Sequence, residues 1–446
     1  MEKANAVSEV YNAVLARPLE IEEMDEFYCD TDQVRGVLSA RKQLKLKIEQ
    51  NAVSGKNGHF LFVGYRGCGK STELNHLQKD LQNDYAILNY SIMEELDPQN
   101  IEYIELFIVT MERLFNLAVE QHLQIDQDFL KKIVNWTSTR EIQDIKDRHF
   151  SVEAETGIEA KAELPYLLKF FFKLKGAAKA SKSFKDTIKQ TIEPRLSDLI
   201  QHCNELISVV RQQMFESKGK KDLVIFIEDL DKIPLHVAER LFYNYATQLI
   251  QLKATVVYTF PVTLYYNIRF GTIGGYFQTI ELPMVKTANK DGSEYTAGIN
   301  ALKAIVNTRI NHALFSNDIV LQQFVEKSGG VIRDIFTMLD DAATSAMLNG
   351  SAMIRDEDFT YAYNQLKKEY NNTIADYKEG EVEHTAKDFY ETMAELVRSG
   401  NKKPDNSAIM MLLRQTLCVL SYNGEGWCDV HPIMKDILAE RGYALN

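Results

Sequence analysis

The order of motifs in this 446-residue sequence predicts an α/β protein built on a doubly wound, mainly parallel sheet. Short apolar runs, typical of strands buried on both faces, alternate with longer segments of helical periodicity. A glycine-rich turn follows one of these runs and a pair of acids follows another, at the strand ends where open α/β sheets bind ligands. The remaining helical segments predict a large, mostly helical insertion, a helical lid domain and a C-terminal winged-helix-like module.

Composition narrows the class of protein. The chain is 45% hydrophobic and 26% charged with a formal net charge of -12, which argues against coating nucleic acid by charge alone but leaves a local basic face open. The cysteines are scattered without a C-x-x-C pair, which favours a reducing compartment and no zinc site. We find neither a signal sequence nor a run of ~20 apolar residues. We therefore expect a soluble, cytoplasmic protein without a membrane partner.

Residues 1–50 predict an N-terminal helical lead-in. Apolar residues recur at helical spacing from Val7 to Val14, and residues 34–48 form a basic amphipathic pattern with Val37, Leu38, Leu44 and Ile48 on its apolar side.

A phosphate-binding motif opens the next unit, which spans residues 51–288. The apolar run His59–Val63 predicts a strand, and residues 64–71 then fit G-x-x-x-x-G-K-[ST] before a helical run. In such a loop the backbone N–H groups cradle phosphates, Lys70 reaches the outer phosphates and the Ser71 hydroxyl binds Mg²⁺. A chance glycine-rich turn is the alternative, but strand and helix flank the motif as it requires. The predicted cofactor-binding residues here are Gly64, Tyr65, Arg66, Gly67, Cys68, Gly69, Lys70, Ser71 and Thr72.

A second strand is predicted over residues 85–92, followed by an insertion at about residues 97–220. The insertion contains helical patterns at residues 101–119 and 194–214, and a basic, aromatic run from Lys169 to Lys185. We expect that run to be a helix or hairpin whose lysines lie over a core face. A nucleic-acid or membrane surface is the alternative.

Acids end the third strand. Leu223–Ile227 is a fully apolar run, and Glu228 and Asp229 follow it. One acid beside Mg²⁺ and one that orients water is what hydrolysis of a nucleoside triphosphate requires. A helix over residues 237–252, a strand over 254–261 ending near Thr259, and a fifth strand over 277–283 complete the predicted P-loop NTPase sheet.

Strands disappear after residue 289. Residues 289–370 predict a helical lid, with helices near residues 297–310, 317–326, 330–348 and 355–370. Residues 371–446 predict a linker to about residue 383 and then two helices and a hairpin signalled by Asn423-Gly424. This order suggests a winged-helix-like module, whose wing is acidic because it carries Glu425 and Asp429.

Together these motifs resemble those of the AAA+ ATPases, in particular the branch that joins replication-initiator ATPases to STAND-type and defence-associated prokaryotic switch ATPases. The resemblance covers residues 33–95 and 220–345. It implies that Glu228 lies on the Mg²⁺ side and that Asp229 activates water. The family has Asp before Glu at these positions, so the reversed order here leaves the two roles open and predicts slow hydrolysis.

The resemblance also implies roles for more distant residues. Thr259 matches the sensor-1 residue, Arg269 the arginine finger that acts on a neighbouring subunit, and Arg333 the sensor-2 arginine. Arg35 matches the segment that covers the base. An ordinary strand threonine, surface arginine or helix-capping arginine remains the alternative for Thr259, Arg269 and Arg333.

The resulting hypothesis is an ATP- and Mg²⁺-binding, slowly hydrolysing oligomeric switch that self-associates and regulates a separate effector. By analogy with the family, bacterial defence against phages or mobile elements is one setting. Two alternatives remain: an initiator-like DNA-binding ATPase that uses the C-terminal module, and a scaffold that holds ATP without hydrolysing it.

Overall fold

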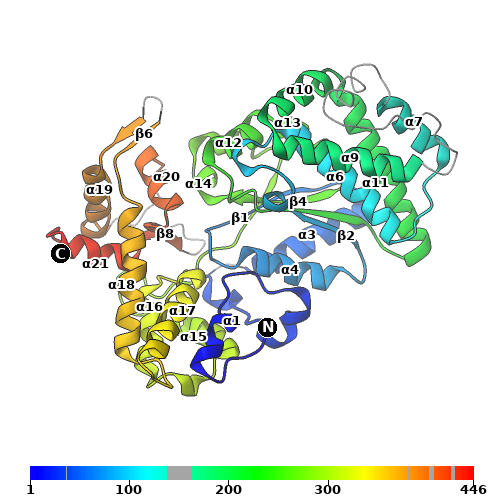
Figure 1. Ribbon diagram of the computed structural model, residues 1–446. Helices are drawn as coiled ribbons and strands as arrows, with labels where there is room; N and C mark the ends of the chain where they lie inside the picture. Colours follow the sequence, from blue (N-terminus) through cyan, green and yellow to red (C-terminus); the bar gives the residue numbers. More distant parts are fainter. Residues whose placement is uncertain (37, 138–162, 380–381, 401–405, 423–426, 446) are drawn as a thin grey trace.

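The computed structural model describes residues 1–36, 38–137, 163–379, 382–400, 406–422 and 427–445 (Figure 1). At its centre is a five-stranded, all-parallel sheet in the order β2-β3-β4-β1-β5. The doubly wound parallel sheet predicted from the apolar runs is confirmed. Its strands are β1 His59–Gly64, β2 Ala86–Ser91, β3 Leu223–Glu228, β4 Thr255–Pro261 and β5 Gln278–Glu281.

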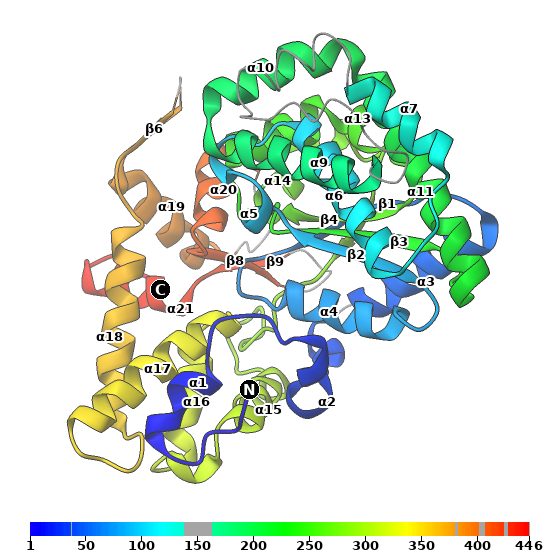
Figure 2. The same ribbon diagram turned by 45° about the vertical axis from the view of Figure 1, so that its right-hand side comes forward.

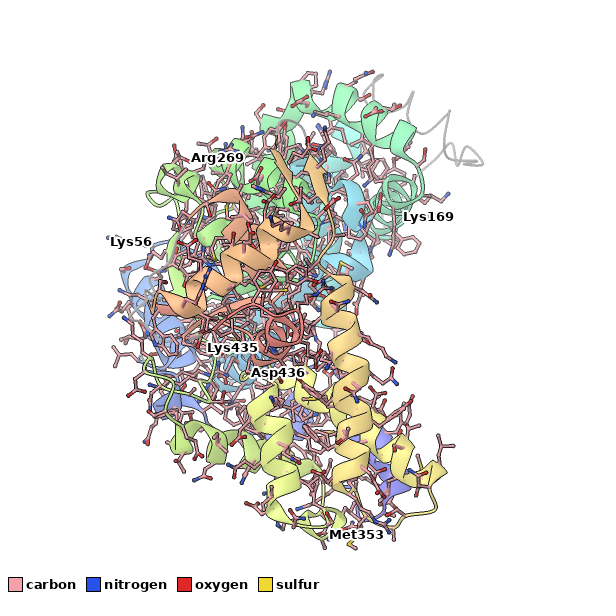
Figure 3. The ribbon with its side chains drawn as sticks, turned by 90° about the vertical axis from the view of Figure 1, so that its left-hand side faces the viewer. Lys56, Lys169, Arg269, Met353, Lys435 and Asp436 are labelled. Atoms are coloured by element: carbon pink, nitrogen blue, oxygen red, sulfur yellow. The ribbon has the colours of Figure 1, made fainter. Side chains whose placement is uncertain are left out.

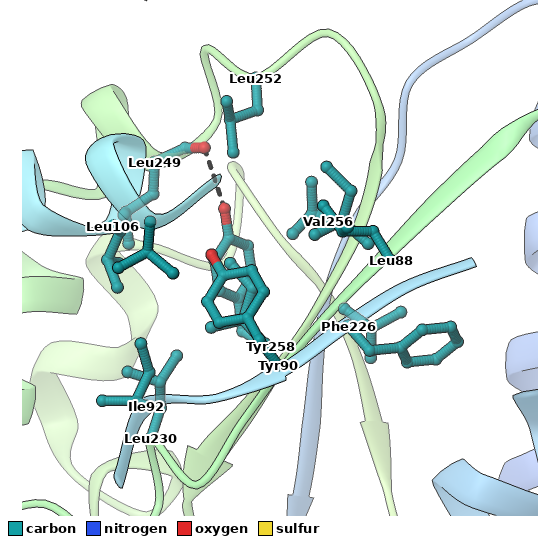
Figure 4. Packing of buried hydrophobic residues seen from close by; sticks show 14 of the residues in the cluster. Leu88, Tyr90, Ile92, Leu106, Phe226, Leu230, Leu249, Leu252, Val256 and Tyr258 are labelled. Carbon is teal, nitrogen blue, oxygen red and sulfur yellow. Dashed lines mark hydrogen bonds between the residues drawn. The ribbon is translucent and has the colours of Figure 1, made fainter. Parts of the chain in front are cut away.

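Helices cover both faces of the sheet. Helices α3 (Ala40–Ser54) and α4 (Lys70–Leu81) lie below it in Figure 1, and the helices of the insertion lie above it. Tyr90 of β2 and Tyr258 of β4 point to the same side, toward Leu106 of the upper helical layer and Leu249, whereas Phe226 of β3 points to the opposite side (Figure 4). The buried Tyr258 hydroxyl donates to the Leu249 carbonyl at 3.1 Å, so its burial leaves no polar atom unsatisfied.

The insertion is helical, as predicted. Two of its lysines, expected to lie over a core face, instead form buried ion pairs. Lys175 Nζ lies 2.5 Å from Glu95 Oε2, and Lys185 Nζ lies 3.4 Å from Glu105 Oε1. Burial raises the pKa of Glu105 to about 7, against the opposing charge of Lys185. The elements are α5 Ile92–Glu95, η4 Pro98–Asn100, α6 Tyr103–Glu120, α7 Gln127–Thr137, α9 Glu163–Ala180, α10 Lys182–Ile192, η5 Glu193–Arg195 and α11 Leu196–Lys218.

Two predicted helices differ in the structure. The helix expected from residue 34 begins only at Ala40, because Gly36 adopts a φ of 75° and Ser39 caps the helix by accepting from the Lys42 N–H at 3.2 Å. Leu38 therefore lies outside the helix and is exposed, and Val37 falls outside the described residues.

The helix expected over residues 237–252 is broken into three pieces. These are α12 Leu235–Glu239, a π-helical turn η6 Arg240–Asn244 and α13 Ala246–Leu249. Tyr245 leaves the helical conformation between the last two, and its ring stacks on that of Tyr103 with a centroid distance of 4.1 Å. The helix is therefore interrupted at Tyr245, the residue that contacts the insertion. Strand β4 then leads into α14 Val262–Tyr265 and η7 Ile268–Thr272.

The lid forms the lower left of Figure 1, and its helices are close to those predicted. They share a second hydrophobic core with the N-terminal segment and most of the C-terminal module. The lid helices are α15 Thr296–Arg309, η8 His312–Leu314, α16 Asp318–Lys327, α17 Ile332–Leu348 and α18 Asp356–Asn372. The N-terminal segment contains η1 Val7–Glu9, α1 Val10–Ala13, η2 Ile21–Glu23, α2 Met24–Phe27 and η3 Asp32–Val34.

The C-terminal residues form helices and two antiparallel strand pairs. The predicted linker itself pairs as β6 Tyr377–Glu379 and β7 Val382–His384, with Lys378 Nζ 2.8 Å from Glu383 Oε2 across the strands. The predicted hairpin forms as β8 Val419–Tyr422 and β9 Trp427–Val430, although Asn423, Gly424 and Glu425 lie outside the described residues. The helices are α19 Ala386–Arg398, α20 Ala408–Gln415 and α21 Pro432–Glu440. Within the described ranges, no helix is long and apolar enough to cross a membrane.

Candidate nucleotide-binding site

The loop between β1 and α4 has the backbone of a phosphate cradle. Strand β1 ends at Gly64, and Gly67 and Gly69 adopt φ values of 78° and 101°, which side-chain-bearing residues rarely adopt. Helix α4 begins at Lys70, so its unpaired N–H groups and positive dipole end face the loop. An added Cβ at Gly64 would lie 2.9 Å from the Leu282 carbonyl oxygen, so the strand end leaves room only for glycine.

Lys70 is buried at the centre of this loop. Its Nζ donates to the carbonyl oxygens of Gly64 and Tyr65, each at 2.8 Å, and lies 2.8 Å from Asp231 Oδ2. Burial opposes ionisation of Asp231, but the charge and hydrogen bond of Lys70 hold its pKa below the ordinary value. A phosphate that binds Lys70 has to replace these oxygen acceptors.

Glu228 lies beside the loop at the end of β3. It accepts a hydrogen bond from Ser71, and burial raises its pKa to about 7 while that hydrogen bond opposes the shift. Gln78 Nε2 lies 3.5 Å from the same carboxyl. A buried carboxylate and a hydroxyl side by side are the oxygen donors that suit Mg²⁺ beside a phosphate, so the two predicted metal ligands fit that ion.

The chain has a P-loop NTPase fold.

Asp229 directly follows Glu228 and adopts a φ of 68°, a left-handed backbone conformation that residues with a side chain rarely adopt. Its carboxylate accepts from Ser91 Oγ at 2.6 Å and lies 2.6 Å from Lys232 Nζ. The next residue, Leu230, donates its N–H to Thr259 Oγ1 at 3.0 Å. Thr259 thus holds the turn that carries the acids in this P-loop NTPase, from the neighbouring strand β4.

The lid touches the P-loop directly. The Ile332 N–H at the start of α17 donates to the Gly67 carbonyl at 3.1 Å, and an added Cβ at Gly67 would lie 2.9 Å from Arg333 Cβ. Arg333 lines the pocket beside the loop, together with Lys70 and Ser71. The structure therefore brings the predicted sensor-2 residue to the phosphate end.

Arg35 and Arg66 brace the loop. Arg35 is buried and donates to Thr31 Oγ1 at 2.9 Å, to the Cys68 carbonyl at 2.9 Å and to the Pro283 carbonyl. Arg66 donates to the Lys232 carbonyl at 2.9 Å. The Arg35 side chain links the P-loop to the segment that follows β5. Arg35 lines the pocket together with other residues of the N-terminal segment, the P-loop and the lid.

Arg269 lies elsewhere. It sits on η7, half exposed, with its guanidinium carbon 4.6 Å from the centroid of the Tyr243 ring and Nη1 3.8 Å from Glu239 Oε2 (Figure 3). It does not line its own chain's pocket. This placement is what a residue acting on a second subunit requires, and it is equally that of a surface arginine.

Tyr65 points away from the pocket and into the C-terminal module. Its buried hydroxyl donates to Ser421 Oγ on β8 at 2.9 Å. Leu420, Tyr422 and Trp427 of the hairpin belong to the same hydrophobic core as the P-loop strand. The hairpin therefore forms part of the support beneath the loop.

The pocket itself has a volume of about 140 Å³ and lies between the P-loop, the N-terminal segment and the lid. Figure 2 shows the N-terminal segment passing between α4 and the lid helices. Sequence reasoning missed Asp231, whose signal was a third acid in the run after β3. It also missed the pocket residues Arg17, Phe27, Cys29, Ile305, Arg309 and Phe336, which no motif marks.

No family model matches this sequence, and no curated protein does. Solved structures similar in fold include the RuvB Holliday junction branch migration motor of Thermotoga maritima (11% identity, TM-score 0.36, covering 97% of this chain and 99% of that one). Others are the ORC2 protein of Aeropyrum pernix (10%, 0.40, 95% and 99%) and Cdc6p of Pyrobaculum aerophilum (12%, 0.36, 94% and 100%). These are AAA+ P-loop ATPases, the class that the motifs of this chain resemble. At such TM-scores the P-loop NTPase assignment rests on the chain's own sheet and loop.

Proposed function

We propose that this protein is an AAA+-like switch that binds ATP with Mg²⁺ and hydrolyses it slowly. The observation that carries the proposal is that Lys70 and Ser71 line one end of a pocket whose other walls are the lid and the N-terminal segment, with Glu228 hydrogen-bonded to Ser71. Phosphoryl transfer needs little from a protein beyond positioning and neutralisation of charge, and these residues supply both.

Each residue has a defined part. Lys70 and the N-terminus of α4 neutralise the outer phosphates, and Ser71 with Glu228 holds Mg²⁺, which would neutralise further charge there. Asp229 orients the attacking water once it leaves Lys232. Arg333 contacts the phosphates from the lid, which couples the lid position to the bound nucleotide.

Slow turnover follows from the position of Asp229. Its carboxylate is engaged by Ser91 and Lys232, and the charge of Lys232 disfavours proton uptake, so Asp229 must leave Lys232 before it can accept a proton from water. The same engagement favours the second candidate function, a scaffold that holds ATP and does not hydrolyse it. The two differ in Asp229→Asn, which lowers turnover in a hydrolysing switch and changes neither turnover nor assembly in a scaffold.

The remainder of the proposal concerns partners. The chain self-associates through the nucleotide site and regulates a separate effector in the cytoplasm, with phage or mobile-element defence as the setting suggested by analogy. Mass measured with and without ATP tests self-association. The face near Lys435 and Asp436 in Figure 3 adds no support to DNA binding, because Lys435 pairs with Asp429 at 2.8 Å and Asp436 with Lys327 at 2.5 Å.

The decisive experiment compares the wild type with Lys70→Ala. We expect the variant to lose nearly all measurable ATP binding and turnover, because Lys70 is the cation held at the centre of the loop in the part of the chain that the structure describes. Arg355→Ala, which removes an exposed arginine paired with Glu357, serves as the matched control and should behave as wild type. Wild-type turnover equal to that of Lys70→Ala, with no nucleotide bound by either, would exclude the proposed function.

A further inference from the structure

The pocket has a second end that the P-loop does not form. Phe27 and Cys29 of the N-terminal segment, Ile305 and Arg309 of α15, and Phe336 of α17 line it. Apolar and aromatic walls with a few polar groups are typical of sites that bind a flat heterocycle. When the phosphates of a nucleotide are bound at the P-loop, its base is the part that reaches this end.

Arg309 is the last residue of α15 and only 5% exposed. Its guanidinium carbon lies 4.3 Å from the centroid of the Phe336 ring, and Nη1 is 3.4 Å from the Ala13 carbonyl oxygen. Among the described residues, its Nε has no hydrogen-bond partner, and no carboxylate forms an ion pair with its guanidinium. Burial, together with the charge of Arg17, lowers its pKa to about 10, so it stays charged at neutral pH.

A buried cation with unused donors is costly for the folded chain. A carboxylate or a set of carbonyls that satisfied the guanidinium would give a structural reason for its burial, but among the described residues it makes only one long hydrogen bond, to the Ala13 carbonyl. The unpaired Nε itself is buried, but Arg309 lines the pocket, where a ligand that carries acceptors can reach the part of the guanidinium that faces the cavity.

The surrounding segment is held in place without Arg309's side chain. The Ala4 N–H donates to the Arg309 carbonyl at 2.8 Å, and the Asn311 N–H donates to the Ala4 carbonyl at 2.8 Å. At the other side, Asn75 Nδ2 of α4 donates to the Leu19 carbonyl at 2.9 Å. Hydrogen bonds thus tie the N-terminal segment to both the lid and the P-loop helix, so this end is formed in advance of binding.

We propose that Arg309 recognises the nucleobase. Its guanidinium donates hydrogen bonds to ring-nitrogen or carbonyl acceptors on a purine edge, while the Phe336 ring packs against the face of the guanidinium. The inference rests on the proposed function, since it requires a nucleoside triphosphate at the P-loop. A guanidinium offers donors only, so it binds base edges that carry acceptors.

The test separates the base from the phosphates. Affinities for ATP and for inorganic tripolyphosphate, which has no base, are measured for the wild type, Arg309→Met and Lys70→Ala. Methionine keeps the apolar packing on Phe336 and removes the donors. We expect Arg309→Met to weaken ATP binding by about tenfold or more and to leave tripolyphosphate binding within about twofold of wild type. Lys70→Ala should weaken both.

Other results overturn the proposal. Equal losses for ATP and tripolyphosphate in Arg309→Met would mean that the arginine acts only through the shape of the pocket. Unchanged ATP affinity would mean that it does not touch the base. Retained tripolyphosphate binding also shows that the variant has folded. If the wild type binds neither ligand, the proposed function fails first, and the inference fails with it.

Discussion

His59, the first residue of the strand that leads into the P-loop, is buried, and burial lowers the pKa of its imidazole to about 4. The unfolded imidazole takes up its proton near pH 6.5. Between these values the unfolded chain binds more protons, so stability falls as pH falls from 6.5 to 4. His59→Gln, which cannot titrate, should therefore lose about 3 kcal/mol less stability over this range than the wild type. Urea unfolding at pH 7.5 and 4.5 measures the difference, and parallel losses in both proteins would contradict the assignment.

Individual residues differ in how far their positions could be predicted. Lys70 and Ser71 lie in a local motif whose spacing fixes their geometry, and the structure places Glu228 beside them as parallel strands require. The partner of Lys70, Asp231, could not be predicted because two acids precede it and only the turn after β3 decides which one points inward. Arg309 carries no sequence signal, since its burial arises from packing of the lid against a segment about 300 residues away.

At the scale of elements, the turn into lid helix α17 is the tightest junction. Gly330 has a φ of 90°, and an added Cβ would lie 1.8 Å from the Val285 carbonyl oxygen, a backbone atom that cannot move aside alone. Gly330→Ala should therefore destabilise the protein by about 2 kcal/mol or more.

Gly350 is a matched control for this substitution. It also has a positive φ, of 66°, but nothing lies within 4 Å of an added Cβ. Gly350→Ala should cost only the left-handed backbone penalty of about 1 kcal/mol. Denaturant unfolding measures both losses, and equal values would show that the contact with Val285 does not restrict the turn.

Elements that are long and strongly periodic were predictable. Strands β1, β3 and β4 match their apolar runs because a strand buried on both faces needs no polar alternation. The first residues of helices were harder to predict. The left-handed conformation of Gly36 and the cap formed by Ser39 outweigh the apolar spacing that suggested a helix start at residue 34. The strand pair at Lys378 and Glu383 could not be read from a polar, acidic stretch, because short exposed strands are fixed by cross-strand pairs rather than by hydrophobic pattern.

At the scale of the whole molecule, Arg269 tests whether sites are completed between subunits. It lies outside its own pocket, so Arg269→Ala should lower turnover by about tenfold or more while ATP affinity changes little. Mixing this variant with Lys70→Ala should restore part of the activity, because each supplies what the other lacks. An equal loss of affinity and turnover, or no recovery on mixing, would assign Arg269 to the surface of a single chain.

The hairpin of β8 and β9 restricts how this protein can evolve by exchange of its C-terminal module. Ser421 Oγ accepts a hydrogen bond from the hydroxyl of Tyr65 in the P-loop, and three hairpin side chains belong to the core of the sheet. A recombination event that exchanged the C-terminal residues for another module would remove support from beneath the loop as well as change the tail. The tail and the ATPase core should therefore descend together as one block, with partner specificity diverging by substitution on exposed faces rather than by module exchange.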